Sequence, residues 1–428
     1  MAHEAGETRS ADAAAPRHAD LGLRRSLTLP YAVLYGMGVT IGAGIYVLIG
    51  AAAVRAGMMA PLAFVIAAIL IGLTGASFAE LGGRMPVAAG EAAYVREGFR
   101  SERWSAAVGL LVIGVAIVAA AAIGVGSAGY IGLFVDLPQP VIVAAVVLAM
   151  GAIAAWGIKE SVIFAGAMTL VEIGGLLLLV AAGAVTEPRL LTRLPEMLPQ
   201  ANLTALVGLV GASLLAVFAF IGFEALVNVA EELEEPRRTL PRAIFLTLGL
   251  TTLLYVLVAW VAVVSVPPAE LAASRAPLAL AFERLTGASQ RVMSAIAVVA
   301  TLNGIIVQII LASRVMYGLS RQGTLPPSLQ AVSPVTRTPL LATGVTATLV
   351  LTFALLLPLE GLADLTARFT LVLFALVNLA LIRIKARERV PPPGIWLAPS
   401  WVPWAAFASC VALLVADFAV VLASTFGG

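Results

Sequence analysis

The residues of this chain that could do chemistry are glycines and single carboxylates inside long apolar segments. Gly36, Gly38, Gly42 and Gly44 fall in one such segment, and each weakens a helix by about 1 kcal/mol relative to alanine. A helix that breaks inside a membrane exposes amides and a positive helix end, to which a carboxylate can bind. Close helix packing is the alternative use of small residues. Spacing alone leaves both interpretations open.

A second candidate break lies at residues 218–224, where Gly222 and Glu224 interrupt another apolar run. An intramembrane carboxylate is energetically expensive, so Glu224 is a candidate functional residue. The alternative is a structural role, in which Glu224 bonds to backbone groups that the break sets free.

Composition identifies the elements that must position these residues as membrane helices. Hydrophobic residues make up 61% of the 428 positions and charged residues only 12%, too few charges to cover a soluble protein of this length. Apolar runs of about 20 residues recur along the chain, and each can cross a bilayer as a helix. The runs are continuous, without the alternation of barrel strands, which excludes a barrel.

We therefore predict an all-α polytopic membrane protein with eleven spans, near residues 31–54, 60–82, 104–133, 139–157, 161–185, 204–230, 239–265, 290–320, 339–358, 361–384 and 401–425. The two candidate breaks are in spans 1 and 6. That offset suggests two five-span repeats of opposite topology, a five-plus-five inverted-repeat transporter fold. The expected parts are a disordered tail (1–25), two repeats (26–185 and 186–384), and a loop with the last span (385–428).

Basic residues predict the orientation. Most of the 26 Lys and Arg residues fall on one side if the spans are numbered as above, and the positive-inside rule makes that side cytoplasmic. The N-terminus is then cytoplasmic, and an odd number of spans places the C-terminus outside a cell inner membrane. The two histidines, His3 and His18, are in the tail, which excludes histidine metal sites and histidine catalysis inside the membrane. The single cysteine, Cys410, can form no internal disulfide.

Four stretches in order resemble the amino acid–polyamine–organocation (APC) transporters, in particular their cationic-amino-acid-transporter-like branch. They are residues 38–46 (Gly-Val-Thr-Ile-Gly-Ala-Gly-Ile-Tyr), 78–86 with 90–94, 218–224 with 231–236, and 313–317 with 323–326. Residues 157–161 are a weaker fifth match. The resemblance implies a bundle of spans 1, 2, 6 and 7 that rocks against a scaffold of spans 3, 4, 8 and 9.

The resemblance also implies an amino acid substrate bound at the two breaks. The amides of residues 42–44 would hold its carboxylate, and carbonyl groups near residues 39, 218, 219 and 221 would hold its ammonium group. Phe220 and Phe223 would be lids over the pocket, with ordinary packing as the alternative. The predicted site comprises Val39, Ile41, Gly42, Ala43, Gly44, Phe218, Ala219, Phe220, Ile221, Phe223 and Glu224.

One position departs from the family. A lysine often lies on the fifth span, about thirteen residues beyond the Gly-x-Lys-Glu-Ser motif, as a protonatable stand-in for the sodium of related symporters. In this chain that position is Glu172. A buried carboxyl group can bind a proton, and it can also ligate a cation. We expect Glu172 to be the proton site with Gln308 of the eighth span as its partner; a cation ligand and a structural hydrogen bond are the alternatives.

Two further intramembrane carboxylates have less specific interpretations. Glu80 ends the second span close to Arg84, and we expect the two to join a cytoplasmic gate or an anchor network. Asp417 of the last span has no evident partner in the sequence, and a contact between protomers is the one account that the sequence suggests.

The expected function is secondary transport of amino acids by alternating access, with proton-coupled uptake of neutral amino acids. A pure exchanger and a polyamine or amine carrier are the alternatives, because the family lysine is absent and Glu224 is a carboxylate near the pocket. Scattered single carboxylates argue against an intramembrane enzyme, and missing charge rings argue against a channel. We expect no cofactor, no metal and no nucleic acid partner; the oligomeric state stays open.

Overall fold

The computed structural model describes residues 27–42, 44–85, 90–156, 162–199, 202–230, 233–388 and 390–426. Across these ranges the regular structure is helical, apart from one isolated bridge between Leu27 and Leu233. This confirms the predicted all-α class. The tail over 1–25, the weaker family match at 157–161 and the acidic pair at 231–232 lie outside the described residues.

The helices before the second break are α1 (Leu29–Ile41), α2 (Gly44–Ala56), α3 (Ala60–Arg84), α4 (Gly90–Phe99), α5 (Glu102–Ile131), α6 (Gln139–Trp156), α7 (Val162–Thr186) and α8 (Leu203–Ala219). Those after it are α9 (Ala225–Asn228), α10 (Pro236–Ser265), α11 (Pro268–Ala273), α12 (Pro277–Thr286), α13 (Arg291–Arg321), α14 (Leu340–Leu356), α15 (Leu359–Arg387) and α16 (Trp401–Phe426).

These helices provide the eleven predicted spans. Eight helical stretches are long and apolar enough to cross a membrane, and one of them, Gly44–Arg84, contains both α2 and α3. The shorter apolar helices are α1, α8 and α14. Because α1 and α2 are halves of one span, and α8 and α9 halves of another, the described helices amount to eleven crossings.

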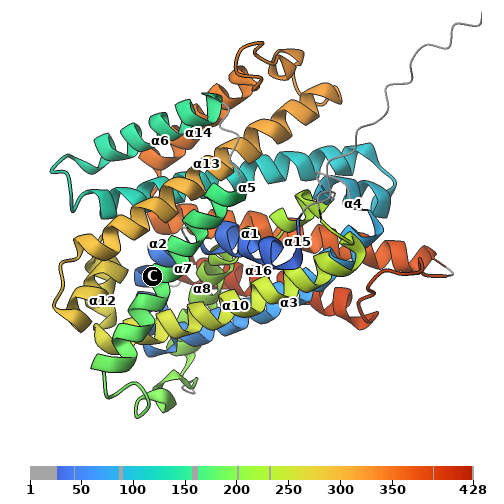
Figure 1. Ribbon diagram of the computed structural model, residues 1–428. Helices are drawn as coiled ribbons and strands as arrows, with labels where there is room; N and C mark the ends of the chain where they lie inside the picture. Colours follow the sequence, from blue (N-terminus) through green and yellow to red (C-terminus); the bar gives the residue numbers. More distant parts are fainter. Residues whose placement is uncertain are drawn as a thin grey trace, which may run out of the picture.

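The spans divide into two groups by packing. Helices α1, α2, α3, α8 and α10 pack on one another, and they form spans 1, 2, 6 and 7. Helices α5, α6, α13 and α14 form the other group, spans 3, 4, 8 and 9. Figure 1 shows α6 beside α14 at one edge and α3 beside α10 at another. The contacts therefore follow the bundle and scaffold that the family resemblance implies.

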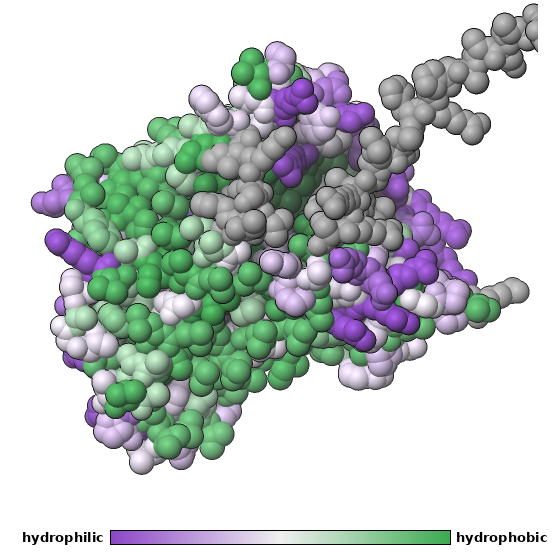
Figure 2. All heavy atoms as spheres, in the orientation of Figure 1, coloured by the Kyte–Doolittle hydropathy of each residue, from purple (hydrophilic) through white to green (hydrophobic). Residues whose placement is uncertain are grey.

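The outer surface suits a bilayer. Large apolar side chains such as Trp156, Leu253 and Phe418 are exposed on helices of span length. Figure 2 shows hydrophobic side chains over the middle of one face, with hydrophilic ones gathered toward the part of the molecule where α4 lies. Exposed apolar surface of this extent is stable only where lipid covers it.

A buried charge network joins α3 to the end of α15 on the side of α4. The fully buried Glu80 carboxylate accepts hydrogen bonds from Arg84 (2.7 and 3.0 Å), Lys385 (2.8 Å) and the amide of Ala398 (2.8 Å). Arg84 also donates to Glu388 (2.7 Å). Of the two roles expected for Glu80 and Arg84, these contacts show an anchor for the 385–398 segment; a gating role remains a prediction.

The opposite end of the molecule holds two further ion pairs between helices. Arg55 of α2 makes a two-point contact with Asp364 of α15, with both distances 2.9 Å. Arg368, one helical turn along α15, donates to Asp417 of α16 at 2.7 and 3.3 Å. Asp417 thus has a partner within its own chain, so the suggested contact between protomers is not needed to explain it.

Candidate functional site

The first span is broken where its glycines lie. Helix α1 ends at Ile41, and Gly42 leaves helical geometry with φ 5° and ψ −103°, its amide reaching back to the carbonyl of Gly38 at 3.3 Å. Helix α2 begins two residues later at Gly44. The structure therefore shows the break at Gly42, whereas Gly36 and Gly38 lie within α1, where a Cβ atom would clash with Thr247 and Thr169, so these two glycines serve close helix packing. Ala43 lies outside the described residues.

The sixth span is broken in the same way. Helix α8 ends at Ala219, and Gly222 adopts φ +124°, which side-chain-bearing residues rarely adopt, before α9 begins at Ala225. The carboxylate of Glu224 accepts a hydrogen bond from the amide of Gly222 at 2.9 Å. Glu224 therefore bonds a backbone group that the break sets free, which is the structural role considered for it.

The two breaks are in direct contact. A Cβ atom built on Gly44 would lie 2.5 Å from the Cα atom of Ala219, and one on Gly222 would lie 2.6 Å from the carbonyl oxygen of Val39. The Tyr255 hydroxyl of α10 bridges them, with 2.9 Å to the carbonyl oxygens of both Thr40 and Ala219. Glycine is thus required at both crossings because the backbones approach too closely for a side chain.

Removal of the Tyr255 hydroxyl is expected to loosen this contact. The Tyr255→Phe variant leaves the carbonyl groups of Thr40 and Ala219 without their bridging donor in a buried place, which costs about 1–3 kcal/mol. We expect a lower unfolding temperature of the purified protein in detergent, measured by tryptophan fluorescence. Tyr317→Phe is the control, since the Tyr317 hydroxyl accepts only from Arg321 on the exposed surface. Equal melting of both variants and the wild type would contradict this role.

A small cavity lies beside the two breaks. Its volume is about 30 Å³. A cavity of this size has room for about two water molecules. The side chains and backbone that line it come from α1, α2, α5, α8 and α13 and from both breaks. They are Gly38, Val39, Thr40, Gly42, Gly44, Ala119, Ile123, Phe218, Ile221, Asn303, Gly304, Val307 and Gln308.

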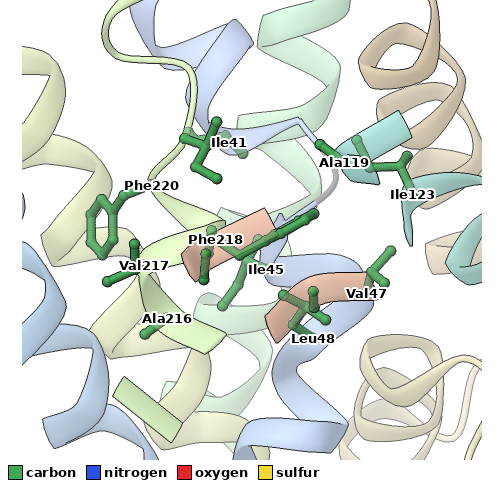
Figure 3. Close-up of a cluster of buried hydrophobic side chains, with 14 of the residues drawn as sticks. Ile41, Ile45, Val47, Leu48, Ala119, Ile123, Ala216, Val217, Phe218 and Phe220 are labelled. Carbon is green, nitrogen blue, oxygen red and sulfur yellow. The ribbon is translucent and has the colours of Figure 1, made fainter. Parts of the chain in front are cut away.

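Part of the predicted substrate site lines this cavity. The residues that do so are Val39, Gly42, Gly44, Phe218 and Ile221, and Gln308, which was predicted as the partner of Glu172, also lines it. Ile41, Ala219, Phe220 and Phe223 are buried around it without lining it. In Figure 3, Ile41 and Phe220 lie on the segments that leave the two helix ends, with Ala119 and Ile123 of α5 across from Phe218.

The two phenylalanines considered as lids pack against other aromatic rings. The Phe220 ring centre lies 5.2 Å from that of Tyr255. The Phe223 ring lies 5.5 Å from that of Phe78 and 5.6 Å from that of Phe374, in edge-on geometry. These are contacts typical of a packed core, and the role of both residues as lids stays a prediction.

Glu172 is fully buried in α7, close to the cavity but not on its wall. Its Oε1 accepts a hydrogen bond from Nδ2 of Asn303 in α13 at 3.3 Å. Its Oε2 has no hydrogen-bond partner within the described residues, and neither has Oε1 of Gln308. The expected partner of Glu172 was Gln308, but the amide that reaches it is Asn303, five residues earlier on the same helix.

Two tyrosines fix the backbone around Glu172. The Tyr46 hydroxyl of α2 donates to the carbonyl oxygen of Glu172 at 2.8 Å, and the Tyr130 hydroxyl of α5 donates to the carbonyl oxygen of Tyr46 at 2.6 Å. This chain of bonds ties the second half of the broken span to α7 and α5. These tyrosines, Tyr255 and Asn303 were not among the site residues predicted from the sequence. Asn303 alone carried a usable signal, as an amide within an apolar span.

Comparison with known proteins shows the family of this chain. The amino acid permease family model matches residues 27–425. The branched-chain amino acid permease BcaP of Bacillus subtilis is 30% identical over 419 residues, covering 91% of this chain and 88% of the relative. The vacuolar cationic amino acid transporter 2 of Arabidopsis thaliana is 28% identical, with 86% and 61% covered, and a methylthioribose transporter of B. subtilis is 26% identical, with 86% and 84% covered.

Matched by the family model over residues 27–425, and built on two broken spans that meet at a cavity, the chain belongs to the amino acid permease family of the APC superfamily and is a membrane transporter of amino acids, not an enzyme.

Proposed function

We propose that this protein takes up neutral amino acids together with a proton, by alternating access across a cell inner membrane, with its N-terminus in the cytoplasm. The observation that carries the proton coupling is the Glu172 carboxyl group. It is fully buried next to the cavity, one oxygen is bonded only to an amide, and the other has no partner within the described residues.

Burial without a basic partner favours proton exchange at this position. None of the ion pairs among the described residues includes Glu172. A lone buried carboxylate is costly, and binding a proton removes that cost. A sodium ion would need several oxygen ligands around it, whereas Asn303 presents a nitrogen donor to Glu172. The geometry therefore supports a proton more than a metal cation.

The cavity supports a neutral, apolar substrate. Ala119, Ile123, Phe218, Ile221 and Val307 contribute apolar side chains to its wall. None of the described residues that line it is charged, so a basic or acidic substrate side chain would be desolvated without a partner. One relative is named for branched-chain amino acids, which have side chains of this kind.

The breaks supply groups for the two charged ends of an amino acid. The amide groups at the start of α2, at Gly44, form a positive helix end for the carboxylate, and the carbonyl groups at the end of α1 can accept from the ammonium group. The cavity of about 30 Å³ is too small for an amino acid. Substrate entry therefore requires the bundle and the scaffold to move apart, as alternating access demands.

The decisive experiment compares the wild type with Glu172→Gln in liposomes, using labelled neutral, basic and acidic amino acids with and without an inward proton gradient. We expect the gradient to drive accumulation of the neutral class in the wild type. Accumulation should be lost in Glu172→Gln, because an amide cannot release a proton, while exchange against preloaded substrate persists. The control is Glu360→Gln, a glutamate exposed at the start of α15, which should match the wild type.

Two outcomes would contradict the proposal. Uptake that needs preloaded amino acid and ignores both the gradient and the Glu172 substitution would make the protein an exchanger. Faster uptake of basic amino acids or polyamines than of neutral amino acids would show that the uncharged cavity wall does not determine the substrate selectivity.

A further inference from the structure

Asn303 lies between the buried carboxyl group and the cavity. Its Nδ2 donates to Glu172 Oε1 at 3.3 Å, and the same residue is part of the cavity wall. Glu172 itself does not reach that wall. Among the described residues, Asn303 is therefore the side chain that connects Glu172 to the cavity by a hydrogen bond.

An amide side chain has a donor on one branch and an acceptor on the other. With Glu172 ionised, the carboxylate can only accept, so the NH2 group of Asn303 must face Glu172 and the Oδ1 branch is left for the cavity. With Glu172 protonated, the acid gains an O–H donor. It can then donate to Oδ1 once the amide rotates by half a turn, and this rotation presents the NH2 group to the cavity.

We propose that Asn303 is a positioning residue that links proton binding at Glu172 to substrate binding in the cavity, by exchanging the amide group that it presents there. The inference rests on the proposed function and adds the residue that carries the coupling. The O–H bond made on Glu172 is balanced by the O–H bond broken in a hydronium ion, which leaves water, and no other covalent bond changes.

A second unsatisfied atom indicates which form of the cavity binds substrate better. Oε1 of Gln308, on the same cavity wall, is a buried acceptor without a donor among the described residues. When the amide of Asn303 donates to Glu172, its Oδ1 is left as a second acceptor on the wall that holds Gln308 Oε1, and Asn303 offers no donor to the cavity. The protonated form supplies that donor, to Gln308 or to a substrate carboxylate. Proton binding should therefore tighten substrate binding, as a symporter requires.

The other titratable groups near Glu172 do not replace this link. Tyr46 of α2 and Tyr255 of α10 face it, and their hydroxyls already donate to backbone carbonyl oxygens. On α12, Arg284 is paired with Glu270 and Glu283 accepts from Gln290. Within the described residues no lysine, arginine or aspartate forms an ion pair with Glu172, which leaves Asn303 as its side-chain partner.

The test measures L-leucine affinity against pH for purified full-length protein in detergent, by isothermal titration calorimetry. For the wild type we expect affinity to strengthen as pH falls, by at most about tenfold per pH unit, the limit for one linked proton. Asn303→Leu should flatten this dependence to less than about twofold over the whole range, although Glu172 is intact. Asn378→Leu is the matched control, since Asn378 is a fully buried amide that bonds to Thr74 on the α3 side (3.1 Å); it should keep the wild-type slope.

A second variant keeps the test decisive if Asn303→Leu does not fold. Asn303→Asp has the same size but places a second carboxyl group beside Glu172, and two such groups share one proton. The pH dependence should then move to higher pH rather than disappear. A wild-type slope in Asn303→Leu, or an unmoved profile in Asn303→Asp, would overturn the inference while leaving the proposed function intact. A flat wild-type profile, together with gradient-independent uptake in liposomes, would instead overturn the proposed function.

Discussion

Replacement of Gly222 by alanine is expected to abolish amino acid binding and transport. Gly222 adopts φ +124°, and a Cβ atom there would lie 2.6 Å from the carbonyl oxygen and 2.8 Å from the carbonyl carbon of Val39. These are backbone atoms at the other break, so no side-chain rotation relieves the clash. The two breaks would have to separate, and the cavity between them would lose its shape. Radiolabelled L-leucine binding to the purified variant is the measurement.

The control for Gly222 is a glycine with similar backbone strain and open space. Gly323 also has positive φ (+77°), but a Cβ atom there would have nothing within 4 Å. Gly323→Ala should therefore cost only the strain of a left-handed residue, about 1–2 kcal/mol, and retain leucine binding. Gly222→Ala protein that bound leucine as tightly as Gly323→Ala would show that the breaks need not touch during binding.

The sequence was sufficient to predict the membrane spans of this fold, but not the shorter helices α4, α11 and α12 between them. Apolar run length located each span, because a helix in lipid has to be long enough to cross it and polar residues mark its ends. The predicted spans 104–133 and 401–425, for example, correspond to α5 (Glu102–Ile131) and α16 (Trp401–Phe426). The breaks were recognisable as candidates, since Gly42 and Gly222 are helix-weakening residues in places where lipid favours unbroken helices, but close helix packing was an open alternative in the first span.

The sequence was less informative about which side chains meet. Asn303 and Gln308 are five residues apart on one helix, so at about 100° per residue they point roughly 140° apart. The choice of the partner for Glu172 therefore depends on the rotation of α13 against α7, which a single sequence does not reveal. The same holds for Tyr255, whose hydroxyl bonds to backbone carbonyl groups, and such contacts carry no complementary residue type that could be recognised.

Charge pairs between helices are partly predictable from the sequence, less so than the spans but more so than the other side-chain contacts. Asp417 and Arg368 are 49 positions apart on adjacent spans and are bonded in the structure. A lone charge inside the membrane is energetically expensive, so the acidic residue in the last span and the arginine in the span before it could have been predicted to form an ion pair. The network around Glu80 was recognised only through Arg84, four residues along the same helix, because Lys385 and the amide of Ala398 approach from distant parts of the chain.

Loss of the Glu80 carboxylate from that network should strongly destabilise the protein. Glu80→Ala removes the carboxylate that accepts from Arg84, Lys385 and the amide of Ala398, and it leaves two cations near a membrane end without their common partner. Removal of one partner from a buried ion pair costs about 3–5 kcal/mol. We expect the unfolding temperature in detergent to fall accordingly, and the 385–398 segment to become accessible to protease.

The matched control is Glu235→Ala, whose partner Arg238 lies 3.8 Å away with both side chains about three-quarters exposed. Exposed pairs contribute about 0–1 kcal/mol, so this variant should unfold like the wild type. Glu80→Gln separates the charge from the shape, because the amide can still accept through one oxygen but no longer neutralises Arg84 and Lys385. If Glu80→Gln unfolds at the same temperature as Glu80→Ala, the negative charge is what stabilises this end of the molecule. If it unfolds at the wild-type temperature, hydrogen bonding to Ala398 is sufficient and the ionic explanation is wrong.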